Sequence, residues 1–592
     1  MMEHFNEPWF QPEFTAGPDK VTSLKDAVRE HVKPGILLHV GQVGARWCTA
    51  ILFEIARQFW GRKNSLELVA LSMNLPQAVL VHGGLVSKII TCYFGDPYYT
   101  PGPNAVFQRS LQDGSLKAEH WSLLTLPLRL QAGAMGVPFL PTKSLLGSSL
   151  ERENPDTFLA MDDPFDKERR IGLVKALTPD LSILHAWMAD SQGNAVFLPP
   201  LSENLYGAMA SRQGVVLSAE KIVSTETIRR YNHLVRLPGT FVRSVSEVPF
   251  GAHPGGLSRI GMVDLDVYAE DYDFIDEGRR CEKSEEEFEA WVQEWVLSCD
   301  SHEAYLEKLG RDRLLRLKGE SHFDMWKFEV GAEKNISRSP SYTPVEMAAV
   351  AMSRKLKETI IRNEYKTMLC GAGISNLAAW LCFYNLRKEG YDIDLIAEVG
   401  LYGYVPRPMD PSIFNHRNFC TCKMVCDIQT VMGLILSGRH GSCIGAIGAA
   451  EIDPLGNVNT TRTSEGTFIT GSGGANDVAS AAREMMVLVG QSKNRFKKHL
   501  GYVTSPGDNL RVVVSTLGLF ERERAGEELV LTACFPCCSG QSHVTPEEIR
   551  ERCGWDLKQA PNIEILDPPV QLELDIIRSF DPNRYYLGKK AE

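Results

Sequence analysis

Residues 36–59, ILLHVGQVGARWCTAILFEIARQF, contain the pattern that decides the fold. The first five of them, residues 36–40, form an apolar run of strand length, and two glycines then permit a sharp turn. The rest of the stretch places Ile51, Ile55 and Phe59 four residues apart, so these side chains share one face of a helix. A strand, a glycine turn and an amphipathic helix in this order predict one unit of an α/β domain.

Neighbouring residues extend this unit, and the whole unit recurs later in the chain. Residues 22–32 have the apolar spacing of a helix, and residues 66–71 form a second strand candidate. After residue 342 a helix start at Thr343 is followed by a strand, a glycine turn, a helix and a strand, predicted at residues 367–370, 371–373, 377–386 and 392–397. The chain is therefore predicted to hold two tandem α/β domains with mostly parallel sheets.

A repeated turn signature also indicates two related halves. Residues 190–194 read DSQGN and residues 453–457 read DPLGN, and each pattern suits a tight turn with an Asp hydrogen bond and a left-handed glycine. The stretch ISRSPSY at residues 336–342 is rich in Ser and Pro, which is typical of a linker. We therefore predict domains at residues 1–335 and 343–592, joined by this linker.

Composition and charge exclude several classes of protein. The 592 residues are 44% hydrophobic and 23% charged, which is globular and excludes a disordered or coiled-coil chain. A net charge of −11 argues against a nucleic-acid-binding protein. The longest apolar stretch, residues 431–450, is interrupted by Arg439 and His440, so no membrane span is predicted. The first 14 residues lack the charge and hydropathy pattern of a signal peptide, and we expect a cytoplasmic location.

The 14 cysteines are concentrated after residue 343 and could be metal ligands or thiols. Two clusters stand out, formed by Cys420, Cys422 and Cys426 and by Cys534, Cys537 and Cys538. A zinc site usually shows paired C-x2-C spacings, which neither cluster has. We predict buried, reduced thiols and no metal site.

The two halves differ where their second strands end. Residues 66–71 read LELVAL and residues 393–398 read IDLIAE, so Leu71 of the first half aligns with Glu398 of the second. Ligands of open α/β sheets gather outside the carboxyl ends of the strands. Glu398 is therefore placed to meet a ligand, and the alternative is an exposed carboxylate in a loop.

A glycine-rich stretch, residues 471–480 (GSGGANDVAS), is the second candidate for chemistry. Its backbone N–H groups could bind phosphate or form an oxyanion hole. It lacks the Gly-Lys-Ser/Thr of a Walker A loop and the G-x-S-x-G of a nucleophile elbow. Residues 371–376 also fail to complete G-x-G-x-x-G, because Asn376 stands in place of the last glycine. These absences argue against a nucleotide hydrolase, a serine hydrolase and a nicotinamide dehydrogenase.

Three blocks of the second half, at residues 398–403, 445–460 and 471–480, resemble the beta-type subunit of class I CoA transferases, closest to the glutaconate CoA transferase group. In the first half, residues 180–194 and 221–256 resemble the alpha-type subunit. The resemblance spans almost the whole chain and implies two normally separate subunits fused in one polypeptide.

The resemblance implies a role for several residues. Glu398, in the E-x-G-x-x-G block, corresponds to the nucleophilic glutamate of the family. The residues implied at the oxyanion and CoA site are Gly400, Gly403, Gly473, Gly474, Ala475 and Asn476. The residues expected in the substrate pocket are Gly41, Gln42, Gly44, Glu119, His120 and Glu451, the last standing where many transferases have Gln.

The function implied is that of a CoA transferase, which moves CoA from an acyl-CoA to a carboxylic acid through a glutamyl-CoA thioester. Such an enzyme needs no metal and no permanently bound cofactor, since CoA and acyl-CoA are substrates. The partners expected are these substrates and further copies of the chain, without nucleic acid or membrane. A basic cluster could contact CoA phosphates or form a solvated loop; its members are Lys493, Arg495, Lys497, Lys498 and His499.

Three alternatives stay open at this point. They are a hydrolase of a thioester or ring carbon–carbon bond, a decarboxylase of a CoA-linked acid, and a CoA-binding regulatory protein. In a hydrolase, Glu119 and His120 would activate water, whereas their structural interpretation is a helix start. Retention of the nucleophilic glutamate favours the transferase.

Overall fold

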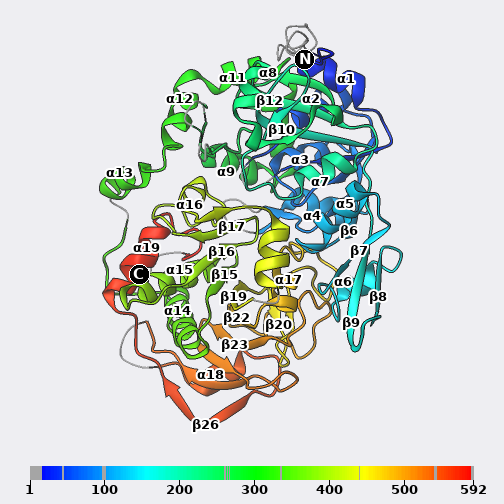
Figure 1. The fold of residues 1–592 in the computed structure, drawn as a ribbon. Coiled ribbons are helices and arrows are strands. Elements are labelled where there is room, and N and C mark those ends of the chain that lie inside the picture. Colours follow the sequence, from blue (N-terminus) through cyan, green and yellow to red (C-terminus); the bar gives the residue numbers. More distant parts are fainter. Residues whose placement is uncertain are drawn as a thin grey trace, which may run out of the picture.

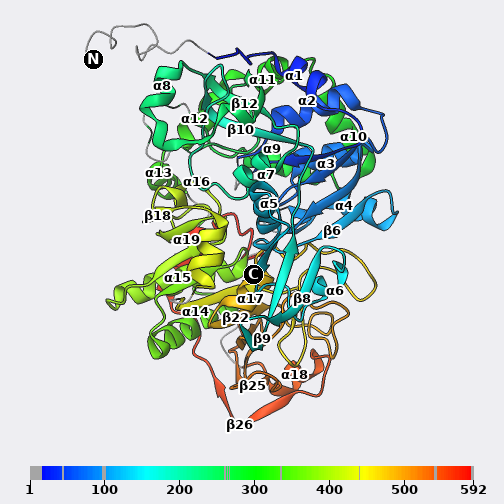
Figure 2. The ribbon, with the colours of Figure 1, turned by 45° about the vertical axis from the view of Figure 1, so that its right-hand side comes forward.

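The chain folds around two large sheets, one in each half, with helices packed against them (Figure 1). The computed structural model describes residues 17–588 except 43–45, 97–101, 259–261, 263–264, 266, 334–335, 439–440 and 539–542. Two views 45° apart both place the blue-to-green first half above the green-to-red second half (Figures 1 and 2). Of the predicted pocket residues, Gly44 lies outside the described residues.

Seven strands of the first sheet lie parallel to their neighbours. Their order across the sheet is β14 (Val242–Glu247), β12 (Val215–Ile222), β10 (Leu181–Ala189), β1 (Ile36–Val40), β2 (Leu66–Val69), β3 (Val86–Thr91) and β6 (Lys117–His120). Two short strands, β11 (Ala195–Val196) and β13 (Val235–Leu237), pair antiparallel at the end of β10. The parallel core of the first half is therefore as predicted.

The second sheet repeats the central part of the first one. Its parallel strands run in the order β23 (Leu510–Ser515), β22 (Glu484–Val489), β19 (Cys443–Gly448), β15 (Thr367–Cys370) and β16 (Asp394–Ala397). These strands match β14, β12, β10, β1 and β2 in order and direction. The edges differ, because β17 (Leu401–Tyr404), β18 (Met424–Val425) and β24 (Gly518–Glu521) join antiparallel, and β25 (Val530–Cys534) and β26 (Lys558–Ile565) extend the far edge.

The helices that flank the central strands begin within three residues of the predicted starts, and the helix predicted at residues 377–386 begins at Ile374. The predicted helices are α1 (Leu24–His31), α2 (Thr49–Phe59), α14 (Pro344–Asn363) and α15 (Ile374–Lys388). Thr343 and Glu346 form both hydrogen bonds of a capping box at the start of α14, as the sequence indicates. Further helices used below are α5 (Thr125–Met135), α12 (Arg311–Glu320), α13 (Met325–Ala332), α17 (Ala475–Ala481) and α19 (Gln571–Phe580).

The two D-x-x-G-N turns have the same hydrogen bonds. Asp190 Oδ1 accepts from the backbone N–H of Asn194 at 2.9 Å, and Asp453 Oδ1 accepts from that of Asn457 at 2.9 Å. In both turns the Asn side chain donates back to the other carboxylate oxygen at 2.9 Å. This identity of local geometry, together with the shared strand order, indicates that the halves are versions of one domain.

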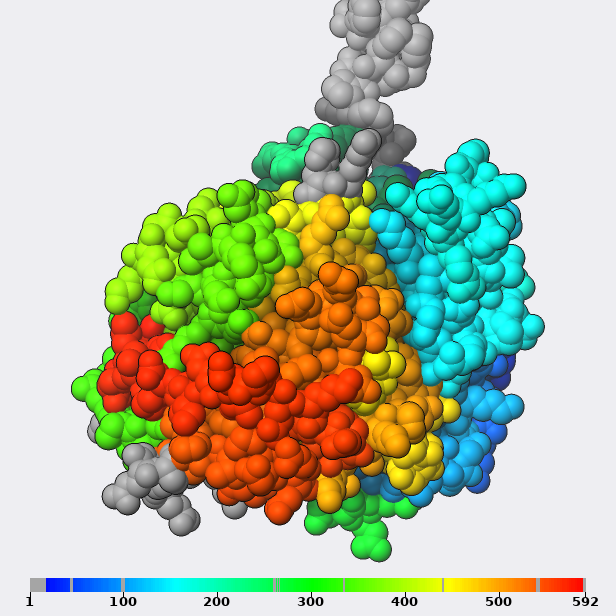
Figure 3. Space-filling view, turned by 90° about the horizontal axis from the view of Figure 1, so that it is seen from below, coloured from blue at the N-terminus to red at the C-terminus, as the bar shows by residue number. Residues whose placement is uncertain are grey.

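The halves pack against each other through apolar side chains. Residues of both halves share one hydrophobic core cluster, which contains Leu71 and Leu124 as well as Ile396 and Met432. A small three-stranded sheet of the first half, β7 (Phe139–Thr142), β9 (Asp166–Lys175) and β8 (Phe158–Asp163), lies alongside the yellow and orange second half when seen from below (Figure 3).

Residues 336–342 lie between α13 and α14, and Arg578 of α19 holds them in place. The Arg578 guanidinium donates to the carbonyl oxygens of Ser339 and Ser341, each at 2.6 Å. The linker therefore has defined hydrogen bonds to the second half.

No helix in the described part of the chain is long and apolar enough to cross a membrane. Within the same residues, no three His, Cys, Asp or Glu side chains are grouped so that they could hold a metal ion. All fourteen cysteines are free thiols, and most of them are buried, although Cys420 is exposed.

Candidate active site

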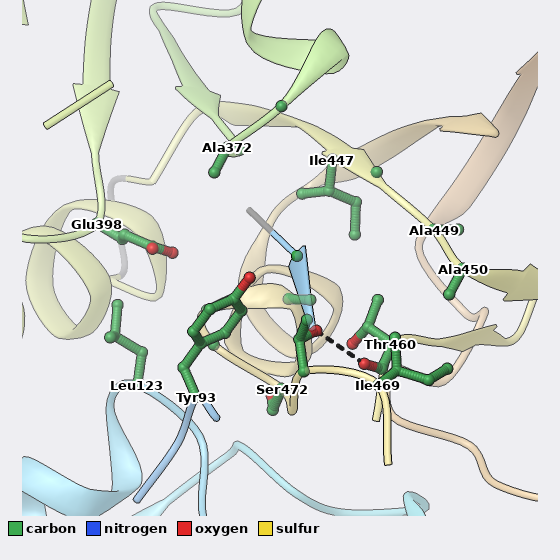
Figure 4. Close-up of a pocket in the computed structure, with 18 of the residues that line it drawn as sticks. Tyr93, Leu123, Ala372, Glu398, Ile447, Ala449, Ala450, Thr460, Ile469 and Ser472 are labelled. Carbon is green, nitrogen blue, oxygen red and sulfur yellow. Dashed lines mark hydrogen bonds between the residues drawn. The ribbon is translucent and has the colours of Figure 1, made fainter. Parts of the chain in front are cut away.

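A cavity of about 610 Å³ lies between the two halves. The residues that follow β2, Leu71 and Ser72, line it from the first half, and those that follow β16, Glu398 and Val399, line it from the second. The aligned pair Leu71 and Glu398 therefore contributes to one site from opposite halves. Figure 4 shows the Glu398 side chain on one side of this cavity, with Ile447 and Ile469 on the other.

Glu398 stands in the short turn where the halves diverge, because β16 turns back into antiparallel β17 instead of leading to another parallel strand. Gly400 has φ +121°, and a Cβ there would lie 2.5 Å from the carbonyl oxygen of Cys426. Gly403 has φ +64°, and its Cβ would lie 2.7 Å from the Lys423 side chain. Neither glycine is among the residues that line the cavity, and both permit the tight turn beside Glu398.

The Glu398 carboxylate packs directly against the backbone of Gly474. A Cβ on Gly474 would lie 2.2 Å from Glu398 Oε2, so any side chain at residue 474 would displace the carboxylate. Burial and the neighbouring Asp477 carboxylate raise the pKa of Glu398 to about 7, while a hydrogen bond from the Gly474 N–H opposes the shift. Glu398 is thus a carboxylate whose charge is poorly solvated and is held by one backbone donor.

The glycine-rich stretch of the second half is hydrogen-bonded to the first half. The backbone N–H of Gly473 donates to the carbonyl oxygen of Cys92 at 2.9 Å, and the Leu123 N–H donates to the carbonyl oxygen of Gly473 at 2.9 Å. The Ala475 N–H donates to the carbonyl oxygen of Ser472 at 3.0 Å. Gly473 and Ala475 both line the cavity, as expected of the oxyanion and CoA site, but their N–H groups already have backbone acceptors. Gly474 is the residue of this stretch whose N–H meets Glu398.

The first turn of α17 fixes the halves relative to the site. Asp477 accepts hydrogen bonds from Ser122 Oγ at 2.6 Å and from the Leu124 N–H at 3.0 Å, both in the first half. Asn476 is fully buried, accepts from the Leu145 N–H at 2.8 Å and donates to the carbonyl oxygen of Thr504 at 2.9 Å. Asn476 is not among the residues that line the cavity, and its hydrogen bonds join the two halves.

Two of the three predicted glycine-turn residues of the first half are described. Gln42 lines the cavity, and its side-chain oxygen accepts from Asn74 at 2.9 Å and from Gln77 at 3.0 Å. A Cβ at Gly41 would lie 2.0 Å from the Leu184 side chain, so this glycine permits close packing and does not face the cavity.

Three of the predicted pocket residues, Glu119, His120 and Glu451, are not among the residues that line the cavity. Glu119 ends in ion pairs with Lys88 at 2.7 Å and Arg129 at 2.6 Å, and it lies on β6 instead of at a helix start. Glu451 is buried, and its Oε2 accepts from Asn459 Nδ2 at 2.7 Å. Neither carboxylate is directed at Glu398 or at the cavity.

His120 is held in an apolar environment. Its ring stacks on Phe468 at 4.6 Å between centroids and lies 4.9 Å from the ring of Phe94. Burial, with the charge of Arg462, lowers the pKa of His120 to about 3, so the imidazole is neutral at physiological pH. Aromatic packing therefore engages His120, as ion pairs engage Glu119.

Several cavity residues carried no recognisable sequence signal. Tyr93 comes from the first half, Phe414 from a loop after β17, and Tyr585 and Tyr586 from the last described turn of the chain. These residues are brought together by the fold from positions nearly 500 residues apart. The basic cluster is the exception: Arg495 lines the cavity, as the prediction of a CoA contact requires.

Comparison with known proteins shows similarity to CoA transferases, as the sequence motifs predict. Residues 21–248 match the family model described as coenzyme A transferase. The chain is similar to the A-type subunit of the glutaconate CoA-transferase of Acidaminococcus fermentans, with 29% identity over 50% of this chain and 94% of that polypeptide. It is also similar to the B-type subunit of the same enzyme, with 27% identity over 43% of this chain and 97% of that polypeptide.

A crystal structure of an acyl-CoA transferase from E. coli O157:H7 has the same fold over both halves. Its TM-score is 0.63 with 15% sequence identity, and the match covers 96% of this chain and 98% of that one. Similarity to an A-type and a B-type subunit, in one chain with two related sheets, accounts for both halves of the molecule. The first half matches the coenzyme A transferase model, and the two halves are similar to an A-type and a B-type subunit, which is the arrangement expected of both subunit types joined in one polypeptide.

Proposed function

We propose that this protein transfers CoA from an acyl-CoA to a carboxylic acid, with Glu398 as the nucleophile. The observation that supports this most directly is the position of Glu398: a poorly solvated carboxylate on the wall of an interdomain cavity, against a backbone N–H of Gly474. The substrates, the acceptor and the cytoplasmic location remain parts of this proposal.

The reaction begins when a Glu398 oxygen attacks the thioester carbonyl of the acyl-CoA. The carbon–sulfur bond breaks, which yields an acyl-glutamyl anhydride and CoA thiolate. The thiolate then attacks the side-chain carbonyl of Glu398, releases the first acid as a carboxylate and leaves a glutamyl-CoA thioester. The acceptor carboxylate then attacks the carbonyl of this thioester, which yields a second anhydride and frees the CoA thiolate. The thiolate attacks the acyl carbonyl of the acceptor, forms the new acyl-CoA and releases the Glu398 carboxylate.

The protein's contribution is to bind, orient and exclude water. The Gly474 N–H, which meets the carboxylate in the free protein, is positioned to donate to the oxyanion that forms on the same side chain. One such donor is typically worth about 3–4 kcal/mol of transition-state stabilisation. Burial raises the pKa of Glu398 and thereby makes the ionised carboxylate a stronger nucleophile than a solvated one.

The hydrolase alternative depended on Glu119 and His120, and both lie outside the cavity. The decarboxylase and the CoA-binding regulator do not require a carboxylate at residue 398. Among these functions, CoA transfer is the one that requires a carboxylate at the position of Glu398.

Borohydride distinguishes these possibilities, since it reduces a glutamyl-CoA thioester and leaves a free carboxylate intact. Protein mixed with an acyl-CoA and no acceptor should lose activity on borohydride treatment, and mass spectrometry should locate the reduced side chain at Glu398. Protein treated without acyl-CoA is the control. Glu398→Gln should form no adduct and should lose exchange, whereas exchange at a near wild-type rate in Glu398→Ala would refute the covalent mechanism.

A further inference from the structure

The charges that line the cavity are few and unevenly placed. Among the described lining residues Glu398 is the one acid and Arg495 the one base, and the remaining residues are apolar or uncharged. Figure 4 shows Ile447, Ala449, Ala450 and Ile469 opposite Glu398, with the uncharged Thr460 beside them. A carboxylate brought into this space by a substrate would meet the like charge of Glu398 in a poorly solvated site.

Arg495 lies at the rim of the cavity, not in its interior. Its side chain is exposed, and it lies in a loop whose neighbours Lys493, Lys498 and His499 are also exposed. Its guanidinium donates weakly to the carbonyl oxygen of Ala449, at 3.4 Å. A solvent-facing basic loop suits the phosphates of CoA, which extend out of a cavity of this volume.

A second cation near the cavity is already neutralised. Arg279 approaches Gly102, which lines the cavity, but it forms an ion pair with Asp96 at 3.0 Å. The hydroxyl groups that line the cavity, such as those of Tyr93 and Ser472, can donate to a neutral carbonyl but cannot balance a full negative charge.

We infer that the acyl groups handled by this protein are uncharged, so that the substrates are monocarboxylic acids with alkyl, alkenyl or aryl chains and not dicarboxylic acids. The inference rests on the proposed function and adds the class of acyl group. The inferred substrates differ from that of the glutaconate CoA-transferase to which this chain is similar, because glutaconate is a dicarboxylic acid.

Pentanoyl-CoA and glutaryl-CoA form a matched pair, since both carry five acyl carbons and differ in a terminal methyl or carboxylate group. The Kd of each should be measured by titration calorimetry on Glu398→Gln, which cannot react. We expect pentanoyl-CoA to bind about 100-fold more tightly, because a buried carboxylate without a partner is strongly disfavoured. Equal affinities, or tighter binding of glutaryl-CoA, would overturn the inference.

The wild-type protein supplies an independent readout, the rate of borohydride-sensitive labelling by each donor. Labelling by pentanoyl-CoA should be at least about 100-fold faster than labelling by glutaryl-CoA. If neither donor labels the protein while the Kd ratio on Glu398→Gln is retained, the covalent function fails and the acyl class stands. If both donors label equally fast, the covalent function stands and the acyl class fails.

Two further variants test the electrostatic cause. Ile469→Arg places a cation inside the cavity and should reduce the preference for pentanoyl-CoA at least 10-fold, whereas Ile565→Arg, on the exposed strand β26, should leave it unchanged. Arg495→Gln should weaken both donors equally, since it removes a contact to CoA. An unchanged preference in Ile469→Arg, or a selective loss of glutaryl-CoA in Arg495→Gln, would contradict the proposed charge pattern.

Discussion

Gly474→Ala tests the contact on which the mechanism depends. Gly474 has φ −84° and ψ −2°, which alanine adopts without strain, so the substitution should not weaken the fold through the backbone. Its new Cβ would lie 2.2 Å from Glu398 Oε2, whereas real contacts of this kind are essentially never below 3.0 Å. The Glu398 carboxylate must therefore move by about 0.8 Å.

A displacement of this size predicts a large kinetic effect. Misplacing a reacting group by about 1 Å can cost about 100-fold in rate, and the moved carboxylate also loses its hydrogen bond to residue 474. We expect kcat/KM for acyl-CoA to fall about 100-fold, with a Tm close to that of the wild type. Because the hydrogen bond from Gly474 lowers the pKa of Glu398, its loss should also move the acidic limb of the pH profile to higher pH.

Controls separate this contact from a general effect of alanine. Gly319→Ala, in α12, meets no atom within 4 Å and should leave kcat/KM unchanged. In a Glu398→Asp background the shortened side chain withdraws from residue 474, so Gly474→Ala should have little further effect there. A Gly474→Ala protein with wild-type kcat/KM and pH profile would show that Gly474 does not position the nucleophile.

Four other outcomes are expected. The raised pKa of Glu398 means that the folded state binds this proton more tightly than the unfolded state does. The free energy of unfolding should therefore fall as pH rises from about 4.5 to about 7. Glu398→Gln should raise Tm at pH 8 and give no gain at pH 4. Asp477→Asn removes a charge that raises the pKa of Glu398, so the acidic limb of kcat/KM should move to lower pH; an unmoved limb would contradict this coupling. Chains divided within residues 336–342 should reassociate into active protein when mixed, and stable fragments without exchange activity would argue against a site between the halves. Glu451→Gln keeps an oxygen to accept from Asn459, so acyl preference in a panel of donors should stay unchanged, against the specificity role expected from the sequence.

Local patterns were sufficient to predict the elements and to single out Glu398 as a candidate. The period of apolar residues is a property of neighbours in sequence, so β1, α2 and β15 could be predicted nearly to their observed ends. The alignment of Leu71 with Glu398 worked for the same reason, because two versions of one domain end equivalent strands at equivalent places. The choice of Glu398 also required the E-x-G-x-x-G resemblance, since a carboxylate after a strand is common.

Tertiary structure alone decided what surrounds Glu398. Whether a backbone N–H is free depends on which carbonyl reaches it, and Cys92, some 380 residues away, takes the N–H of Gly473 but not that of Gly474. Glu119 and His120 have side chains suited to catalysis, yet ion pairs and aromatic packing commit them elsewhere. The sequence specifies which groups exist and how the chain is locally shaped, whereas contacts between distant segments determine which of those groups remain available to a substrate.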